Sequence, residues 1–257
     1  MSKKLTYLII ALYFLSMGAV AKIIEVAPAD ARMNVMIVGG GAPAGAPACA
    51  DSSCTGFEIC QNFESTGYDN SESEWSEGIG SNGIVDEDDQ TATVLRGSYQ
   101  LKVFGGDAGQ SSYARFTFPT ALDEIYLHFR LKTPAANADD VVSVIFRDAS
   151  QGSDLDFYIR GGSDRFRVLT ASGDVYPTDT YSDSTAYHVW IHYKNDGTGS
   201  MGFSTDTTEP TAGNKYGTYS SGSTDSIKSI DFRADSEETI YVDQVIVKTT
   251  AIGQICD

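Results

Sequence analysis

Hydrophobic and polar residues alternate along short segments over most of the chain beyond residue 56. The clearest segment is Glu124–Lys132, where Ile125, Leu127, Phe129 and Leu131 are separated by polar or amphipathic residues. A two-residue period places successive side chains on opposite faces of a β-strand, so this segment predicts a strand with one buried face. The same period recurs in residues 95–103, 142–146, 155–159, 166–168, 189–193, 230–232 and 240–247.

Turn-forming residues separate these segments, and no stretch beyond the N-terminal region has a helical period of useful length. The clusters are Gly105–Asp107, Gly161–Asp164 and Asn195–Gly197. The pattern predicts an all-β domain of about ten to twelve short antiparallel strands, as a sandwich or barrel. One-sided alternation favours two sheets that meet core to core and leave two polar outer faces. A ligand would then bind on one of those faces or on the loops at their rims.

The N-terminal region has the pattern of a secretory signal followed by a linker. Lys3 and Lys4 precede an apolar stretch, Leu5–Val20, and Ala19–Ala21 supplies small residues before a cleavage point. This stretch is shorter than the roughly 20 residues of a membrane-spanning helix, although an uncleaved anchor and a start at Met33 are alternatives. We therefore predict a signal peptide over 1–21, a Gly/Ala/Pro-rich linker over 22–55 and a β-sandwich domain over 56–257. The expected location is secreted or at the cell surface (periplasmic or extracellular), without stable membrane insertion after cleavage.

Charge and cysteine content narrow the class of protein further. The chain has a formal charge of −17, which argues against nucleic acid as a partner because phosphate contacts need clustered cations. The four cysteines lack a C-x-x-C spacing and a histidine cluster, so disulfides are favoured over zinc. Three pairings are open, and Cys49–Cys54 with Cys60–Cys256 is the preferred one.

Several segments, in the order in which they follow one another along the chain, are similar to one group of β-sandwich proteins. They are Phe57–Glu64, Trp75, Leu95–Val103, Tyr187–Tyr193 before a Gly-rich hairpin, and Ile240–Val247 at the end. This order resembles the concanavalin A-like lectin/glucanase jelly rolls, which include the laminin-G-type domains. The first and last segments also resemble carbohydrate-binding modules of galactose-binding-like topology. The resemblance implies a jelly roll that binds carbohydrate, with a structural Ca²⁺ held by Glu64 and Asp243 and no organic cofactor.

Candidate ligand-binding residues occupy the outward positions of the central strands. Arginine recognises carboxylates in bidentate fashion, and aromatic rings stack on sugars, so together they suit an acidic polysaccharide. If these strands share one sheet, the residues form a basic, aromatic-lined groove; the alternative is a solvated face with arginines paired to cross-strand aspartates. The set is Tyr126, His128, Arg130, Arg147, Tyr158, Arg160, Arg167, His188, Trp190 and His192.

Three functions follow from these observations. The leading hypothesis is a secreted, non-catalytic carbohydrate-binding or adhesion domain with a glycan or polysaccharide as its partner. The second is a polysaccharide lyase that cleaves uronate polymers by β-elimination, with Arg130 as the neutralising group, His128 or His192 and Tyr158 in proton transfer. A glycoside hydrolase would need an E-x-D-x-E-like array, and no strand carries one. The third is a structural protein of a cell surface or virion without a small ligand. No catalytic residue is assigned.

Overall fold

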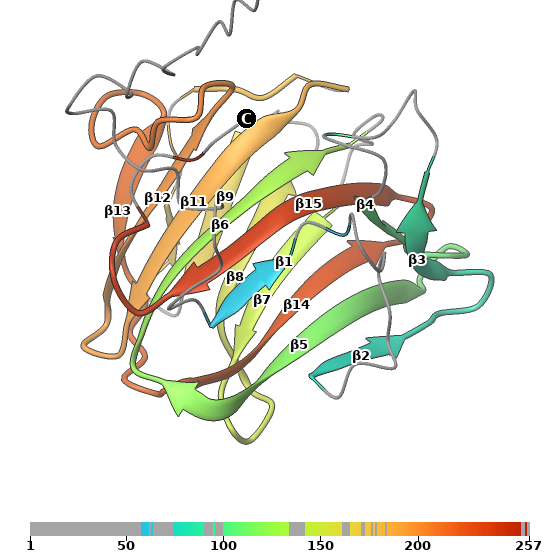
Figure 1. The fold of residues 1–257 in the computed structure, drawn as a ribbon, viewed down its shortest axis with the longest axis horizontal. Helices are drawn as coiled ribbons and strands as arrows, with labels where there is room; N and C mark the ends of the chain where they lie inside the picture. The colour runs from blue at the N-terminus through green and yellow to red at the C-terminus, as the bar shows by residue number, and fades with distance from the viewer. Residues whose placement is uncertain are drawn as a thin grey trace, which may run out of the picture. The chain divides into compact units, whose positions relative to one another are not determined.

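Two antiparallel sheets make up the fold, as the computed structural model shows (Figure 1). It describes residues 58–61, 63, 74–89, 95, 100–133, 142–160, 165–170, 173–175, 177, 179–182, 184–252 and 255. For residues 142, 154, 158–160 and 173–175 only the backbone is described. The described residues belong to one compact unit that spans Ala48–Asp257. None of them forms a helix long and apolar enough to cross a membrane.

The first sheet has eight strands, and its long central strands β6 and β15 are hydrogen-bonded to each other. Its order is β13 (Tyr216–Ser220), β12 (Thr198–Ser204), β11 (Tyr187–Lys194), β6 (Glu124–Lys132), β15 (Thr239–Lys248), β4 (Gln100–Phe104) and β3 (Ile84–Asp88); β1 (Ile59–Gln61) also pairs with β15.

The second sheet has seven strands and is centred on β8, β7 and β14. Its order is β10 (Gly173–Val175), β9 (Arg165–Thr170), β8 (Ser153–Arg160), β7 (Val142–Arg147), β14 (Ile227–Asp235), β5 (Ser111–Leu122) and β2 (Trp75–Gly78).

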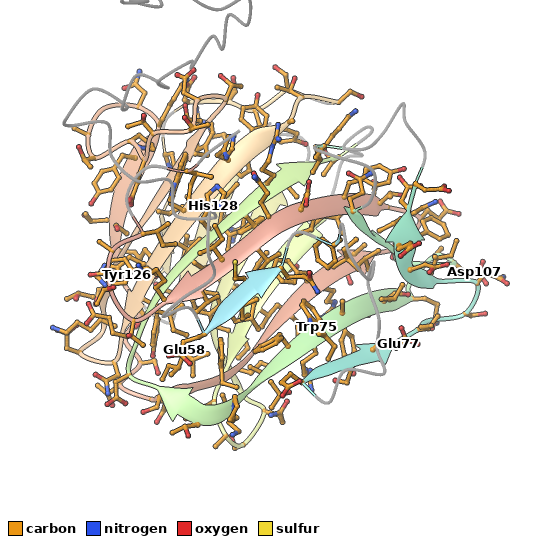
Figure 2. The ribbon with its side chains drawn as sticks, viewed as in Figure 1. Glu58, Trp75, Glu77, Asp107, Tyr126 and His128 are labelled. Carbon is orange, nitrogen blue, oxygen red and sulfur yellow. The ribbon has the colours of Figure 1, made fainter. Side chains whose placement is uncertain are left out.

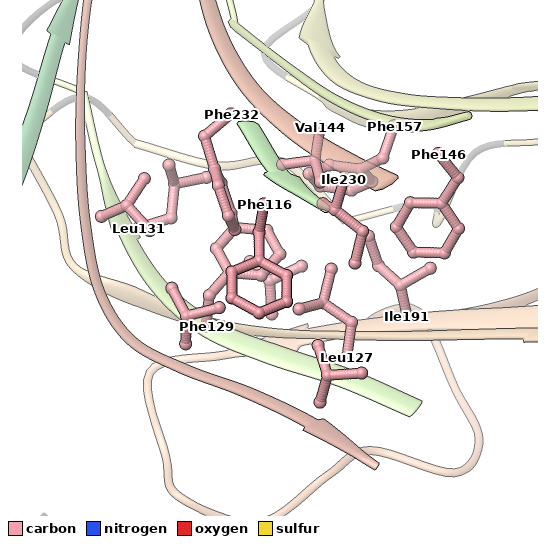
Figure 3. Packing of buried hydrophobic residues seen from close by; sticks show 14 of the residues in the cluster. Phe116, Leu127, Phe129, Leu131, Val144, Phe146, Phe157, Ile191, Ile230 and Phe232 are labelled. Carbon is pink, nitrogen blue, oxygen red and sulfur yellow. The ribbon is translucent and has the colours of Figure 1, made fainter. Parts of the chain in front are cut away.

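The core lies between the two sheets and is rich in aromatic side chains (Figure 3). Phe129 of the first sheet meets Phe232 of the second in an edge-to-face contact, with ring centroids 5.6 Å apart. Phe203 and Phe166 make a second contact between the sheets, at 4.2 Å. Three of these four rings, Phe129, Phe232 and Phe166, come from the apolar positions of the alternating segments. The two-sheet antiparallel sandwich predicted from the alternation is confirmed.

A β-bulge interrupts the alternation in β15. The inward residues of this strand change phase between Val242 and Val245, and its register against β6 shifts between Asp243 and Ile246. Gln244, at the bulge, has a φ of 49°, in the left-handed region. The bulge therefore lets both halves of β15 direct their apolar side chains into the core.

The main departure from the predicted strands is β5, a twelve-residue strand that the sequence pattern did not single out. Its inward side begins with Ser112 and Ala114, which carry little hydrophobic signal, before Phe116 and Phe118. Short strands such as β2, β3 and β10 add to the difference, and the described residues contain fifteen strands in all.

Several predictions fall on residues that the structure does not describe. They concern the signal peptide over 1–21, the linker over 22–55, the calcium ligand Glu64 and the cysteines Cys49, Cys54 and Cys256. Cys60 is disulfide-bonded. Its partner lies outside the described residues, so the pairing stays a prediction.

Candidate functional site

The ten predicted ligand-binding residues do not form one groove, because their strands belong to different sheets. Strands β6 and β11 lie in the first sheet, whereas β7, β8 and β9 lie in the second. The chain changes sheet between β6 and β7, and alternation within each strand carries no information about that change. The first sheet carries Tyr126, His128, Arg130, His188, Trp190 and His192, and the second carries Arg147, Tyr158, Arg160 and Arg167.

Two histidines, His128 and His188, and Trp190 are buried at the centre of the first sheet's outer face. Figure 2 labels His128 among them. His128 Nε2 lies 3.0 Å from His188 Nδ1, and the two rings are stacked with centroids 5.2 Å apart. Trp190 packs against both imidazoles. Burial, and then the neighbouring His188, hold the pKa of His128 well below its ordinary value, so this ring is neutral near pH 7.

The C-terminal segment of the chain covers part of this face. Ile252 and Ile255 are buried against Trp190 and Ile246 in a cluster separate from the main core. The backbone N–H of Ile255 donates to the carbonyl of Thr207 at 3.2 Å, which holds the segment in place. Trp190 is therefore a packing residue, and the expectation that this face is wet does not hold at its centre.

The rim of the same face carries a partly exposed group of titratable side chains. Tyr126 and His192 are stacked with centroids 4.1 Å apart, and both bond to Glu124 Oε1, at 3.1 Å from Tyr126 Oη and 2.9 Å from His192 Nε2. The hydrogen bond from His192 lowers the pKa of Glu124, whereas burial raises the pKa of Glu209 nearby. The crevice beside these residues, bounded by Trp190 and Ile252, has no room for a water molecule. This crevice is therefore closed to a ligand.

The outer face of the second sheet is organised around a buried carboxylate. Asp231 on β14 is fully buried and accepts hydrogen bonds from two arginines, with Arg115 Nε and Arg147 Nε each 2.6 Å from a carboxylate oxygen. Gln151 joins them, because its side-chain oxygen accepts from Arg115 at 2.7 Å and its carbonyl from Arg147 at 3.0 Å. Arg147 thus neutralises a buried charge, and about a fifth of its side chain, 18%, remains exposed.

Next to this network, a row of two arginine, two tyrosine and one serine positions crosses five adjacent strands of the second sheet. We call it the arginine row. The strand register places its members opposite one another in the order Arg167, Tyr158, Ser143, Arg233 and Tyr113. Four strand spacings of about 4.8 Å give this row a length of roughly 19 Å. The side chain of Arg233 is 34% exposed, and its Nε donates to Asp235 at 2.8 Å.

Two members of the arginine row were missed by the sequence reasoning. Tyr113 lies on β5, which the pattern did not identify, and Arg233 lies beside the predicted segment 230–232. The alternation of Tyr113, Arg115 and Thr117 with small or apolar residues is a signal that could have found β5. The position of Arg233 opposite Ser143, and of Tyr113 opposite Arg233, by contrast depends on long-range pairing.

The predicted calcium ligands are only partly visible. Asp243 is buried at the bulge of β15, where its Oδ1 accepts from the backbone N–H of Gln244 at 2.7 Å, and Arg130 takes the register position opposite it. Glu64 lies outside the described residues. Within the described ranges no group of three or more acidic, histidine or cysteine side chains could hold a metal ion. Calcium therefore stays a prediction.

Comparison with solved structures defines the class of fold. The cellulose induced protein Cip1 superimposes with a TM-score of 0.56 at 18% identity, covering 77% of this chain and all of that one (100%). A structure described as the conserved carbohydrate esterase vb_24B_21 from Shiga toxin-encoding bacteriophage phi24B gives 0.54 at 12% identity, covering 76% and 99%. No protein-family profile matches the chain, and neither does any curated protein sequence. The fold is the concanavalin A-like lectin/glucanase β-sandwich, as the resemblance implied.

Proposed function

We propose that this chain is a secreted, non-catalytic glycan-binding or adhesion domain that binds acidic polysaccharide along the arginine row. The row is the observation that carries the proposal. The outer face of the first sheet is a poorer candidate, because its central rings are buried and its rim crevice is closed.

The charge distribution of the second sheet supports an anionic ligand. The five strands that the row crosses contain four acidic residues, Asp154, Asp156, Asp231 and Asp235. The same strands carry seven cations on a chain whose formal charge is −17: Arg165, Arg167, Arg160, Arg147, Lys228, Arg233 and Arg115. Arg167 is buried, and Arg115 and Arg147 are bonded to Asp231. Such a local excess of guanidinium groups attracts carboxylate- or sulfate-bearing polymers to this face. Tyr113, at the other end of the row from Arg167, is partly exposed, and the guanidinium of Arg115 lies over its ring, 4.9 Å from the centroid.

A lyase is not favoured by the geometry. The residues suggested for uronate elimination lie on two sheets, with Arg130 and His128 on the first and Tyr158 on the second. They cannot act on one sugar unit. His192, the alternative base, is hydrogen-bonded to Glu124 at the rim. A structural role in an assembly is the remaining alternative, and the absence of any glycan binding together with large particles in size-exclusion chromatography would favour it.

Replacing Arg233 with alanine is expected to weaken binding to alginate about tenfold, the effect of roughly 1.4 kcal/mol. The substitution removes an exposed guanidinium from the middle of the row and leaves the core intact. Affinity is measured by isothermal titration calorimetry at low and moderate salt, with neutral dextran as the comparison ligand.

The matched control for this experiment is Lys194→Ala. Lys194 is an exposed cation on the first sheet, paired with Asp196 at 2.6 Å, so the variant loses the same charge from the opposite sheet. We expect its affinity to change by less than about twofold, because distant surface charges are screened. Equal weakening in both variants would indicate a nonspecific charge effect and would contradict the proposed site.

A further inference from the structure

A cavity of about 460 Å³ opens beside the arginine row, at the end of the second sheet. One side is formed by Asp156 of β8 and Leu169 of β9, and the other by the loop after β13, with Ser223 and Asp225. Its volume lies in the range of ordinary small-ligand sites. Leu155, a core residue, contributes an apolar floor.

The loop that closes this cavity is held by its own hydrogen bonds. Ser221 Oγ accepts from the backbone N–H of Ser223 at 3.2 Å, and Ser223 Oγ accepts from that of Asp225 at 3.1 Å. The carbonyl of Asp225 accepts from the hydroxyl of Tyr193, a core residue, at 2.7 Å. The cavity wall is therefore preorganised, and a ligand does not have to order it on binding.

The lining of the cavity selects for an uncharged, hydroxyl-rich ligand. Two carboxylates, Asp156 and Asp225, line the cavity with several serine and threonine hydroxyls, and no lysine or arginine is among the described residues that line it. Carboxylates accept strong hydrogen bonds from hydroxyls and repel anionic groups. Leu169 is 38% exposed and offers an apolar surface for the C–H face of a sugar ring.

We propose that this cavity is a subsite for a neutral sugar unit, so that the ligand is a heteropolysaccharide with both neutral and anionic units. Leu169 is two residues from Arg167 on β9, and Asp156 is two residues from Tyr158 on β8, so cavity and row adjoin. One chain can then place an anionic unit on the row and a neutral unit in the cavity. This inference rests on the proposed function, because it needs the arginine row as the anionic site.

The test is the affinity of Asp225→Ala for two polymers, measured side by side by calorimetry. Deacylated gellan contains glucose and rhamnose beside glucuronate, whereas alginate is made of uronates alone. Removal of a negative charge by itself strengthens the binding of both polymers or leaves it unchanged. Loss of a hydroxyl acceptor in the cavity predicts the opposite for gellan, a weakening of about fivefold, with alginate not weakened.

Two further variants complete the experiment. Leu169→Ser keeps the charge and removes the apolar contact, and it is expected to weaken gellan binding about threefold without affecting alginate. Asp107→Ala is the matched control, since it removes an exposed carboxylate at the turn between β4 and β5 (Figure 2). If neither cavity variant distinguishes gellan from alginate, the neutral subsite is wrong and the proposed function stands. If the wild-type chain binds neither polymer, the proposed function fails, and the subsite fails with it.

Discussion

Replacing Asp231 with alanine is expected to lower the free energy of unfolding by about 3–5 kcal/mol, the usual cost of breaking a buried ion pair from one side. Asp231 is fully buried between Arg115 and Arg147, and the hydrogen bond to Asp231 is the main cause of a raised pKa of the Arg115 guanidinium. Without the carboxylate, the two guanidinium groups, which come from the strands on either side of β14, are left without the negative charge between them. Urea denaturation followed by circular dichroism measures the loss.

Asp235→Ala is the appropriate comparison for this substitution. Asp235 pairs with Arg233 on the same strand, but both side chains are about one-third exposed, at 31% and 34%. Exposed pairs contribute roughly 0–1 kcal/mol, so this variant is expected to unfold close to the wild-type midpoint. Similar losses for the two aspartates would mean that burial of Asp231 does not determine its contribution.

The second large effect is a loss of stability as the pH falls below about 6.5, the ordinary pKa of histidine. His128 is neutral in the folded protein because burial and the neighbouring His188 hold its pKa well below that value. The unfolded chain binds a proton at that site and the folded chain does not. The contribution of His128 to the free energy of unfolding is therefore fully present above about pH 6.5. It decreases by about 1.4 kcal/mol per pH unit as the pH falls towards the pKa that His128 has in the folded protein.

The groups around His128 decide how this prediction is tested. Arg130 on the same strand lowers the pKa of His128 further, and the backbone of Gln244 on β15 opposes the shift. Trp190 and His188 face it from β11, and the carboxyl of Asp243 is buried on β15. Glu209 at the rim acts in the opposite direction, because burial raises the pKa of its carboxyl and protonation at lower pH favours the folded state.

A His128→Gln variant separates these contributions, because it removes the imidazole and leaves the other groups in place. We expect it to be less stable at neutral pH and to show a flatter dependence of unfolding free energy between about pH 7 and about pH 5. The measurement is a urea denaturation series across that range for both proteins. Curves that stay parallel over the whole range would show that His128 does not carry the acid sensitivity.

Alternation within single strands was enough to predict the core of this protein. The apolar residues of Glu124–Lys132 are all buried, and the change of phase in the segment 240–247 corresponds to the bulge at Gln244. The candidate site could not be predicted in the same way. Which face of which sheet a residue occupies depends on pairings such as that of Ser143 with Arg233, ninety residues apart in sequence. Burial of His128 and Trp190 depends on tertiary contacts, including the packing of Ile252 and Ile255, and these are not periodic.

The position of the last two strands has a consequence for how the chain folds. In the second sheet β14 lies between β5 and β7, and in the first sheet β15 lies between β4 and β6, although both strands are the final ones in sequence. Until the residues from 227 onward have been synthesised, each sheet lacks the strand that joins its two parts, β14 in the second sheet and β15 in the first. Folding of the two sheets must therefore await the synthesis of β14 and β15, and the high contact order of these pairings predicts that folding is slow.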